Sequence, residues 1–174
     1  MPLFTLPYLI RVLGVETYGL VVFAQSVNMF FTVLVDFGFN LSATREVAVN
    51  RDNKEKLTEI FSSVMQIKVL LSIVSFLFLL CMVIFVDKFS NEWLLYLLAF
   101  LSVFAQALFP VWYFQGMERM KYITIVNIIS RGIFTIAIFV FVNSEIDYLW
   151  VPLLNGVGFI IGSVISLWIV HQVL

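Results

Sequence analysis

Long runs of apolar residues limit what this chain can fold into more than any other feature of its sequence. Five segments of roughly 20 or more residues carry very few charges: Tyr18–Leu41, Ile60–Val86, Trp93–Gln115, Tyr122–Val142 and Tyr148–Val170. A helix of about 20 residues, rising about 1.5 Å per residue, crosses a hydrocarbon core about 30 Å thick. Because unpaired backbone groups are costly in lipid, segments that cross it fold as helices. The sequence therefore predicts an all-α, polytopic transmembrane helical bundle.

The composition agrees with a lipid environment. Hydrophobic residues make up 62% of the chain and charged residues 12%, with a mean hydropathy of +1.05. Soluble domains average about 45–50% apolar and about 25% charged residues. A net charge of -1 argues against a nucleic-acid partner, which would need a concentrated basic face. Cys81 and His171 are the only residues of their types, so we expect no disulfide, no zinc site and no cofactor.

The connections between the spans are short and hold most of the charge. They are Arg11–Thr17, Ser42–Glu59, Asp87–Glu92, Gly116–Lys121 and Asn143–Asp147. Before them, Met1–Ile10 is apolar but too short to cross a membrane, so we interpret it as the end of an earlier helix. We therefore expect about five full spans plus a partial first helix, forming a single transmembrane lobe over residues 1–174 with no extramembrane domain.

Basic residues are divided unevenly between the two sides of the predicted bundle. Short connections make successive spans antiparallel, so the connections alternate between sides. One set carries Arg45, Arg51, Lys54, Lys56, Arg119 and Lys121. The other carries only Arg11 and Lys88. Because cytoplasmic connections are rich in Lys and Arg, the first set is predicted to face the cytoplasm.

Three of the spans carry polar residues at intervals of three or four, which places them on one face of a helix. These stripes are Gln25, Asn28, Thr32, Asp36 and Asn40; Ser102, Gln106, Pro110 and Tyr113; and Thr124, Asn127, Arg131 and Thr135. One interpretation is that they line a hydrated central cavity. The alternative is that they hydrogen-bond neighbouring helices, each pair contributing about 0.6 kcal/mol.

Charged residues inside the spans favour the cavity. A charge at the centre of a bilayer costs at least about 2.5–3.5 kcal/mol and is rare without a function. Arg131 lies near the middle of its span, whereas Lys68 and Asp36 lie nearer the predicted cytoplasmic end. Lys68 has the alternative of reaching to the interface. Asp36 has the alternative of an ion pair with Arg45 or Arg131 that stabilises packing.

Two further patterns have simpler explanations. Gly158, Gly162 and Ser166 recur every four residues, which is typical of close helix packing in membranes. Asp36-Phe37-Gly38 matches a kinase tripeptide but has no glycine-rich loop or catalytic loop beside it. No phosphate-binding loop or Ser/His/Asp set is present in the sequence, and we do not expect an enzyme.

Several sequence blocks resemble the bacterial polysaccharide biosynthesis flippases of the O-antigen (Wzx) type. They are Pro7–Gly14 followed by Tyr18-Gly19, Asp36–Phe39 followed by Ala43–Glu46, and Pro110–Glu118. The resemblance implies two six-helix lobes around a central cavity, of which this chain matches the first without the start of its first helix. It also implies a multi-pass protein of the bacterial inner (cytoplasmic) membrane.

The implied activity is transport for surface polysaccharide biosynthesis. Members of the family move polyprenyl-diphosphate-linked oligosaccharide repeat units from the cytoplasmic to the periplasmic leaflet by alternating access. The implied partners are the lipid-linked oligosaccharide, membrane lipids, and the polysaccharide polymerase and chain-length proteins.

The charged residues suit a diphosphate, because arginine binds phosphate through paired hydrogen bonds. We expect Arg131 and Arg11 to contact the diphosphate at successive stages. Arg45 and Lys68 are expected to attract it near the cytoplasmic entrance.

The remaining predicted site residues are polar or acidic. Gln25, Asn28 and Asn127 are expected to face sugar hydroxyls. Asp36 is a candidate for ion coupling or for holding an arginine in place, and the sequence does not separate these two roles.

Three other functions remain open at this stage. A drug or cation antiporter of the same architecture needs an acidic cavity, yet Asp36 is the one carboxylate well inside a span, against Lys68 and Arg131. A membrane scaffold subunit would tolerate neutralisation of Arg131. A membrane enzyme acting on lipid carriers would need a larger loop than any found here.

Overall fold

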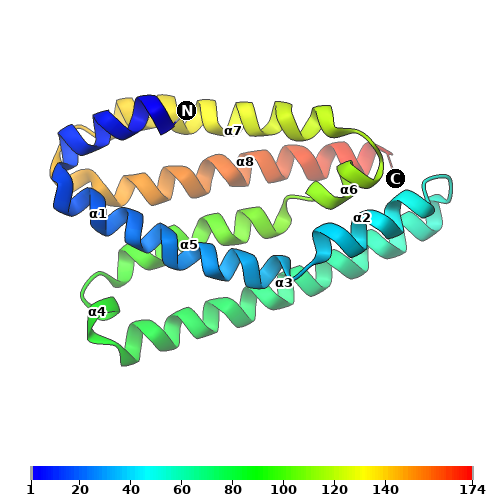
Figure 1. Ribbon diagram of the computed structural model, residues 1–174, viewed down its shortest axis with the longest axis horizontal. Coiled ribbons are helices and arrows are strands. Elements are labelled where there is room, and N and C mark those ends of the chain that lie inside the picture. The colour runs from blue at the N-terminus through cyan, green and yellow to red at the C-terminus, as the bar shows by residue number, and fades with distance from the viewer. Residues whose placement is uncertain (1, 174) are drawn as a thin grey trace.

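The computed structural model describes residues 2–173, which form helices joined by short turns (Figure 1). The helices are α1 (Pro2–Asp36), α2 (Phe39–Val49), α3 (Lys54–Phe85), α4 (Asp87–Ser90), α5 (Trp93–Leu108), α6 (Val111–Gly116), α7 (Met120–Phe141), η1 (Glu145–Leu149) and α8 (Trp150–Val173). No strand occurs in this part of the chain. Five helical segments of it are long and apolar enough to cross a membrane. The predicted polytopic all-α bundle is confirmed.

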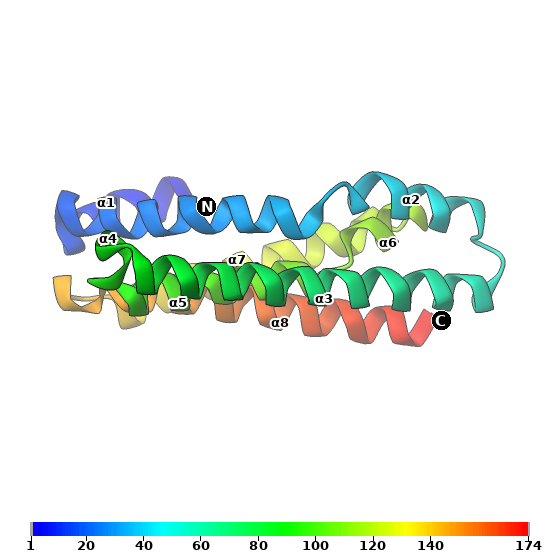
Figure 2. The ribbon, with the colours of Figure 1, turned by 90° about the horizontal axis from the view of Figure 1, so that it is seen from below.

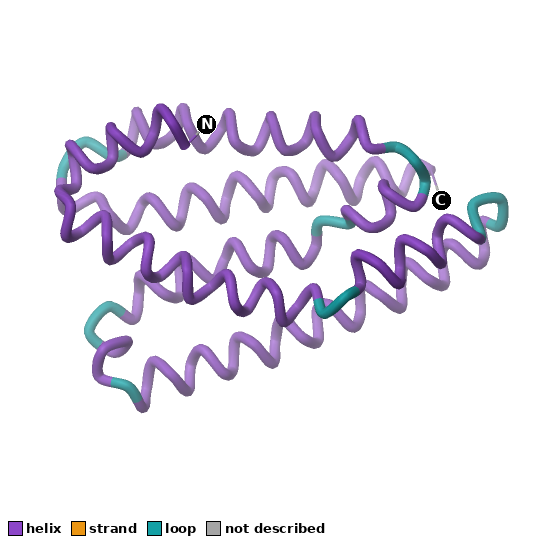
Figure 3. Tube along the Cα trace, in the orientation of Figure 1, coloured by secondary structure: helices purple, strands orange, loops and turns teal. Residues whose placement is uncertain are grey.

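The long helices run along one common axis, and α5 lies at the centre of the bundle (Figures 1 and 2). It packs against α8, α1 and α3, while α7 packs against the other side of α8. Most turns gather at the two ends of the bundle (Figure 3). One end holds the α2–α3 turn and the C-terminus, and the other holds α4 and η1 (Figure 1). This grouping agrees with the predicted alternation of connections between two sides.

The predicted connection Arg11–Thr17 lies where the chain does turn, but it is much shorter than predicted, because all of its residues except Gly14 are helical. Gly14 has φ 77° and ψ 163°, a conformation open almost only to glycine, and the chain reverses direction there (Figures 1 and 2). Thr17 Oγ1 donates a hydrogen bond of 2.8 Å to Glu145 Oε1. Tyr8 likewise donates one of 2.8 Å to the carbonyl oxygen of Val142. Both bonds hold this helical hairpin against the segment that links α7 to α8.

The predicted connection Ser42–Glu59 is also wrong over most of its length. It contains most of α2 and the start of α3, which leaves only residues 50–53 as a turn. Ala43 and Val47 are buried on one face of α2, while Arg45 is exposed on another. A charged segment of this kind can be an amphipathic helix when its few apolar residues recur every four positions.

Two predicted spans are interrupted inside the bundle (Figure 3). The span Tyr18–Leu41 breaks after Asp36, where Gly38 has φ 80°. The span Trp93–Gln115 breaks at Phe109 and Pro110, because proline has no N–H to continue the helical hydrogen bonds. These breaks separate α2 and α6 from the helices that precede them, and α2 and α6 pack against each other.

Candidate functional site

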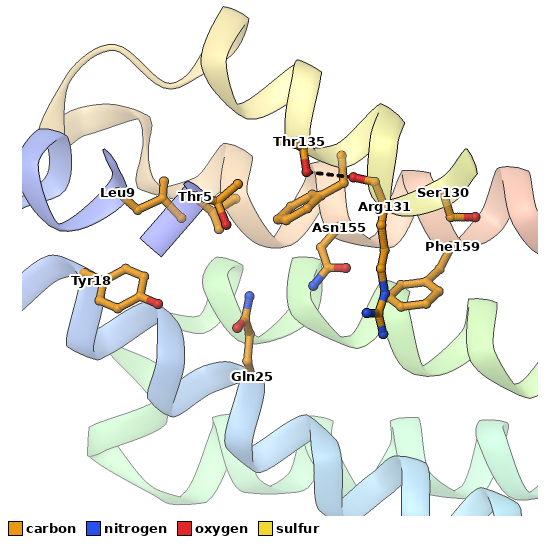
Figure 4. Close-up of a pocket in the computed structure, with 11 residues that line it drawn as sticks. Thr5, Leu9, Tyr18, Gln25, Ser130, Arg131, Thr135, Asn155 and Phe159 are labelled. Carbon is orange, nitrogen blue, oxygen red and sulfur yellow. Dashed lines mark hydrogen bonds between the residues drawn. The ribbon is translucent and has the colours of Figure 1, made fainter. Parts of the chain in front are cut away.

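Two adjoining pockets form a groove between α1 and α7, with α5 and α8 beneath it. The first, which we call the arginine pocket, has a volume of ≈ 300 Å³ and is lined by residues of α1, α7 and α8 that include Arg131 (Figure 4). The second, the amide pocket, has a volume of ≈ 560 Å³ and is lined mainly by α1 and α5. Gln25, Asn155 and Phe159 line both pockets. The groove is therefore continuous from one pocket to the other.

Arg131 is the cation of this groove. Its side chain extends from α7 toward the ring of Phe159 on α8 (Figure 4). Thr135 donates a hydrogen bond of 2.8 Å to the backbone carbonyl of Arg131, which leaves the guanidinium uninvolved in that contact. None of the ion pairs among the described residues includes Arg131. Its guanidinium, which carries five N–H donors, therefore lines the pocket without a salt bridge to any described carboxylate.

The amide pocket follows the polar stripe that was predicted on the span after residue 18. Gln25, Asn28, Thr32, Asp36 and Asn40 all line it. Ser102 and Gln106 of α5 line the opposite wall. Tyr113, grouped with them in the sequence, does not continue this wall and is 1% exposed, packed against the ring of Phe61. The break at Pro110 changes the direction of the helix, so the three-to-four spacing no longer applies beyond it.

Asp36 pairs with Lys68, at 2.9 Å between Oδ1 and Nζ. The predicted alternatives for Asp36 were Arg45 and Arg131, and neither is its partner here. Lys68 is 1% exposed, so its side chain is enclosed within the bundle and does not extend to the protein surface. A buried charge of this kind is stable only with a partner, and the partner comes from the end of α1. This pair joins α3 to the last turn of α1, next to the break at Gly38.

The other predicted site residues lie outside these two pockets. Arg11 is exposed close to the Gly14 reversal, and Arg45 is exposed on α2. Asn127 lines a third depression of ≈ 320 Å³ on α7, together with Thr124, Ile128 and Arg131. The structure therefore brings Gln25, Asn28, Asp36 and Arg131 into one groove and places Asn127 beside it.

Sequence reasoning did not assign Asn155 and Phe159 to the site. Both lie on α8, where the glycine and serine spacing directed attention to packing. Asn155 faces the same space as Gln25 (Figure 4). An amide within an otherwise apolar span was the signal that could have identified it.

Comparisons with known proteins identify relatives over almost the whole chain. The sequence profile of a family described as "Polysaccharide biosynthesis protein" matches residues 1–173. A curated relative from Escherichia coli (strain K12), named "Putative O-antigen transporter", is 32% identical over 170 residues, covering 98% of this chain and 41% of the relative. A relative of the same name from Shigella dysenteriae is 29% identical over 173 residues, covering 98% of this chain and 43% of the relative.

The chain thus spans about two-fifths of the length of the curated relatives it matches. No solved structure gives a significant match to it. The family match extends over nearly every residue, including α1 with its groove-lining stripe and the whole of α7 and α8. The chain therefore belongs to the polysaccharide biosynthesis protein family and is a multi-pass membrane protein.

Proposed function

We propose that this chain is the first lobe of a flippase that moves polyprenyl-diphosphate-linked oligosaccharide repeat units across the bacterial inner membrane. The direction is from the cytoplasmic to the periplasmic leaflet, and the product serves surface polysaccharide synthesis. The observation that carries the proposal is the groove, in which an arginine that forms no ion pair with a carboxylate of residues 2–173 lies beside a row of amides. The names of the curated relatives support the same class of function.

Arg131 suits the diphosphate for two reasons. A guanidinium forms paired hydrogen bonds with phosphate oxygens and remains charged at any physiological pH. A charge in a groove with apolar walls acts through a lower dielectric than water, so its attraction for an anion is strong. Arg45, exposed on α2 at the predicted cytoplasmic end, is proposed to meet the diphosphate before it reaches Arg131. Arg11, exposed at the opposite end of the bundle, is proposed to meet it afterwards.

The groove fits a drug or cation antiporter less well. Asp36 is the one carboxylate among the residues that line the two pockets, and its charge is balanced by Lys68. A cationic substrate would therefore meet the positive charge of Arg131 without a compensating acid. We also propose that the protein acts as a transporter and not as an enzyme, with the polymerase and chain-length proteins acting on its product.

The decisive experiment removes the gene and measures both surface polysaccharide and lipid-linked repeat units. We expect loss of the polymer with accumulation of the lipid-linked repeats. The complete wild-type gene restores the polymer, whereas Arg131→Ala, inserted in the membrane at the same level, lowers it at least about tenfold, since a charged hydrogen bond contributes about 1.5–3 kcal/mol.

Lys121→Ala is the matched control, because it removes a positive charge from the exposed start of the same helix, away from the groove. It should restore the polymer fully. Normal polymer in the deletion strain, with no second transporter of this kind in the cell, would refute the flippase and favour the antiporter. Full rescue by Arg131→Ala would favour the scaffold subunit.

A further inference from the structure

The amide pocket contains an acceptor that has no partner. Asn28 is 2% exposed, and its Oδ1 finds no hydrogen-bond donor among the described residues. Its Nδ2 donates a bond of 3.1 Å to the carbonyl oxygen of Ala24, which fixes which end of the amide is the oxygen. A buried acceptor without a donor is destabilising, and this one lines a pocket. The arrangement points to a ligand that supplies a donor.

Three neighbouring side chains of the pocket likewise use side-chain donors in hydrogen bonds to backbone carbonyl groups. Thr32 donates to the carbonyl of Asn28 at 3.2 Å, Ser102 to that of Ala99 at 2.7 Å, and Gln106 to that of Ser102 at 3.3 Å. One donor of each of these side chains therefore bonds to the backbone of its own helix, and Gln106 alone of the three keeps a second N–H. The oxygen atoms of the same three side chains retain lone pairs. At Asn28 and these three side chains, more acceptor than donor positions are consequently left for a ligand.

Asp36 adds a charged acceptor to this wall. Lys68 holds one of its carboxylate oxygens at 2.9 Å and balances its charge, while the Asp36 side chain stays 34% exposed and lines the pocket. A carboxylate held in this way accepts hydrogen bonds from hydroxyl groups more strongly than a neutral oxygen. The pair carries no net charge, so it does not repel an anionic substrate as a lone carboxylate would.

These acceptors do not suit a metal ion or a phosphate. Asn28 and Asp36 are eight residues apart on α1, a rise of about 12 Å, whereas a bound cation needs its oxygen ligands within about 2.6 Å of one point. A diphosphate is itself rich in acceptors and needs donors, which Arg131 supplies in the other pocket. An extended molecule with many hydroxyl or amide N–H donors is complementary to the whole row.

We propose that the amide pocket is the sugar subsite of the groove, in which Asn28, Thr32, Gln106 and Asp36 accept hydrogen bonds from the oligosaccharide, with Lys68 as the positioning residue of Asp36. This inference rests on the proposed flippase function and adds to it the orientation of the substrate along the groove. The diphosphate lies at Arg131, and the sugars extend from there along α1 toward the break before α2. Lys68 then affects sugar binding only by positioning Asp36, and it does not itself contact the diphosphate.

The test compares two ligands on the purified complete gene product. One is the polyprenyl-diphosphate-linked repeat unit extracted from cells that lack the protein, and the other is polyprenyl diphosphate without sugars. We expect Asn28→Leu to weaken binding of the sugar-bearing lipid about fivefold and to leave the bare lipid unchanged. Ser26→Leu is the matched control, because Ser26 is exposed on the same helix outside the pocket, with its hydroxyl bonded to Val22. It should change neither affinity.

The ion pair is tested with two variants. Asp36→Leu/Lys68→Met removes both charges of the pair together and so leaves no buried lysine charge without a partner that would prevent folding. It should lower the affinity for the sugar-bearing lipid at least about tenfold and change the affinity for the bare lipid by no more than about twofold. Lys68→Met alone should show the same selectivity for the sugar-bearing lipid. A purely structural role for Lys68 would change both affinities together, and so would direct contact of Lys68 with the diphosphate.

The outcomes separate this inference from the proposed function. Wild-type protein that binds both lipids with equal affinity refutes the sugar subsite, even if Arg131→Ala weakens both. The sugar subsite is also refuted if the Asn28 and Asp36 variants lose equal affinity for both lipids. Wild-type protein that binds neither lipid refutes the flippase itself, and the subsite with it.

Discussion

Single residues determine where this chain reverses and where it breaks. Gly14 replaces a predicted connection of several residues by one backbone conformation, at φ 77° and ψ 163°. Apart from Gly14 and its two chain neighbours, no described atom lies within 4 Å of the position that a Cβ would take there. The need for glycine at this position is therefore conformational and does not come from a lack of space.

Gly14→Ala is expected to destabilise the fold by about 1–3 kcal/mol, the cost of holding a non-glycine residue in this region of φ and ψ. Gly19→Ala is the matched control, because Gly19 is helical and equally uncrowded. Alanine is the better helix former, so the control should be neutral or slightly stabilising. Thermal unfolding of the two variants in detergent measures the difference. Equal unfolding midpoints for the two variants would contradict the claim that the backbone conformation at residue 14 requires glycine.

Arg51 and Glu118 join two turns at the basic end of the bundle, at 2.7 Å between Nη2 and Oε1. The hydrogen bond from Arg51 lowers the pKa of Glu118 below its ordinary value, and the bond to Glu118 raises the pKa of Arg51. Because the folded-state pKa of Glu118 is lowered, the pair stabilises the fold above the pKa of the unfolded carboxyl group. That contribution is lost as the pH falls through the folded-state pKa.

Glu118→Gln should therefore lower the unfolding midpoint slightly at neutral pH and have no effect in strong acid. High salt should also remove the difference, since the pair is exposed and screened. Asp52→Asn is the control, because Asp52 lies beside Arg51 and acts on it only through charge. Midpoints measured from neutral pH to about pH 3 check the prediction, and a difference that persists in acid would count against it.

At the scale of helices, small residues set the distance between α7 and α8. A Cβ on Gly158 would lie 3.0 Å from the carbonyl oxygen of Ser130. One on Gly162 would clash with Ser130 Oγ and lie 3.0 Å from Val126 Cγ1. The packing role predicted for this spacing is confirmed. Because α8 also packs against α5, the same contact holds the floor of the groove under Arg131.

Gly162→Ala should push α7 away from α8 and destabilise the bundle by about 1–3 kcal/mol. Gly132→Ala, on α7 with no atom within 4 Å, should not destabilise it. Thermal unfolding and rescue of surface polymer can be measured on the same two variants. We expect the unfolding midpoint and the amount of rescued polymer to fall for Gly162→Ala and to stay unchanged for Gly132→Ala. A loss of equal size in Gly132→Ala would show that the effect is not one of packing between these helices.

At the scale of the whole molecule, the two ends of the bundle differ in charge. The end that holds the α2–α3 turn carries most of the basic residues of the connections. With Cys81→Ser as background, single cysteines at Asn53 and Asn91 lie in exposed turns at opposite ends. A membrane-impermeant maleimide should label Asn91→Cys in spheroplasts and Asn53→Cys only after lysis. The reverse pattern would invert the orientation and the direction of the proposed transport.

The sequence determined the environment, the helical class and the polar stripe on α1. Backbone groups must pair within a helix in lipid, so runs of this length leave no other fold, and spacing of three or four residues holds as long as a helix continues. The same reasoning predicted that Arg131, Gln25 and Asn28 line a cavity, and they line the groove. A charge or an amide inside an apolar span is recognisable without any knowledge of its neighbours.

Only the tertiary structure decided which elements meet. The partner of Asp36 is Lys68, from a helix whose rotation about its axis no local pattern reveals. Asn155 reaches the groove because α8 packs between α5 and α7. The interruption at Pro110 depends on one residue, within sequence that otherwise continues a helical pattern. Contacts between distant segments arise from packing, and packing is set by the whole bundle, not by the residues adjacent in sequence.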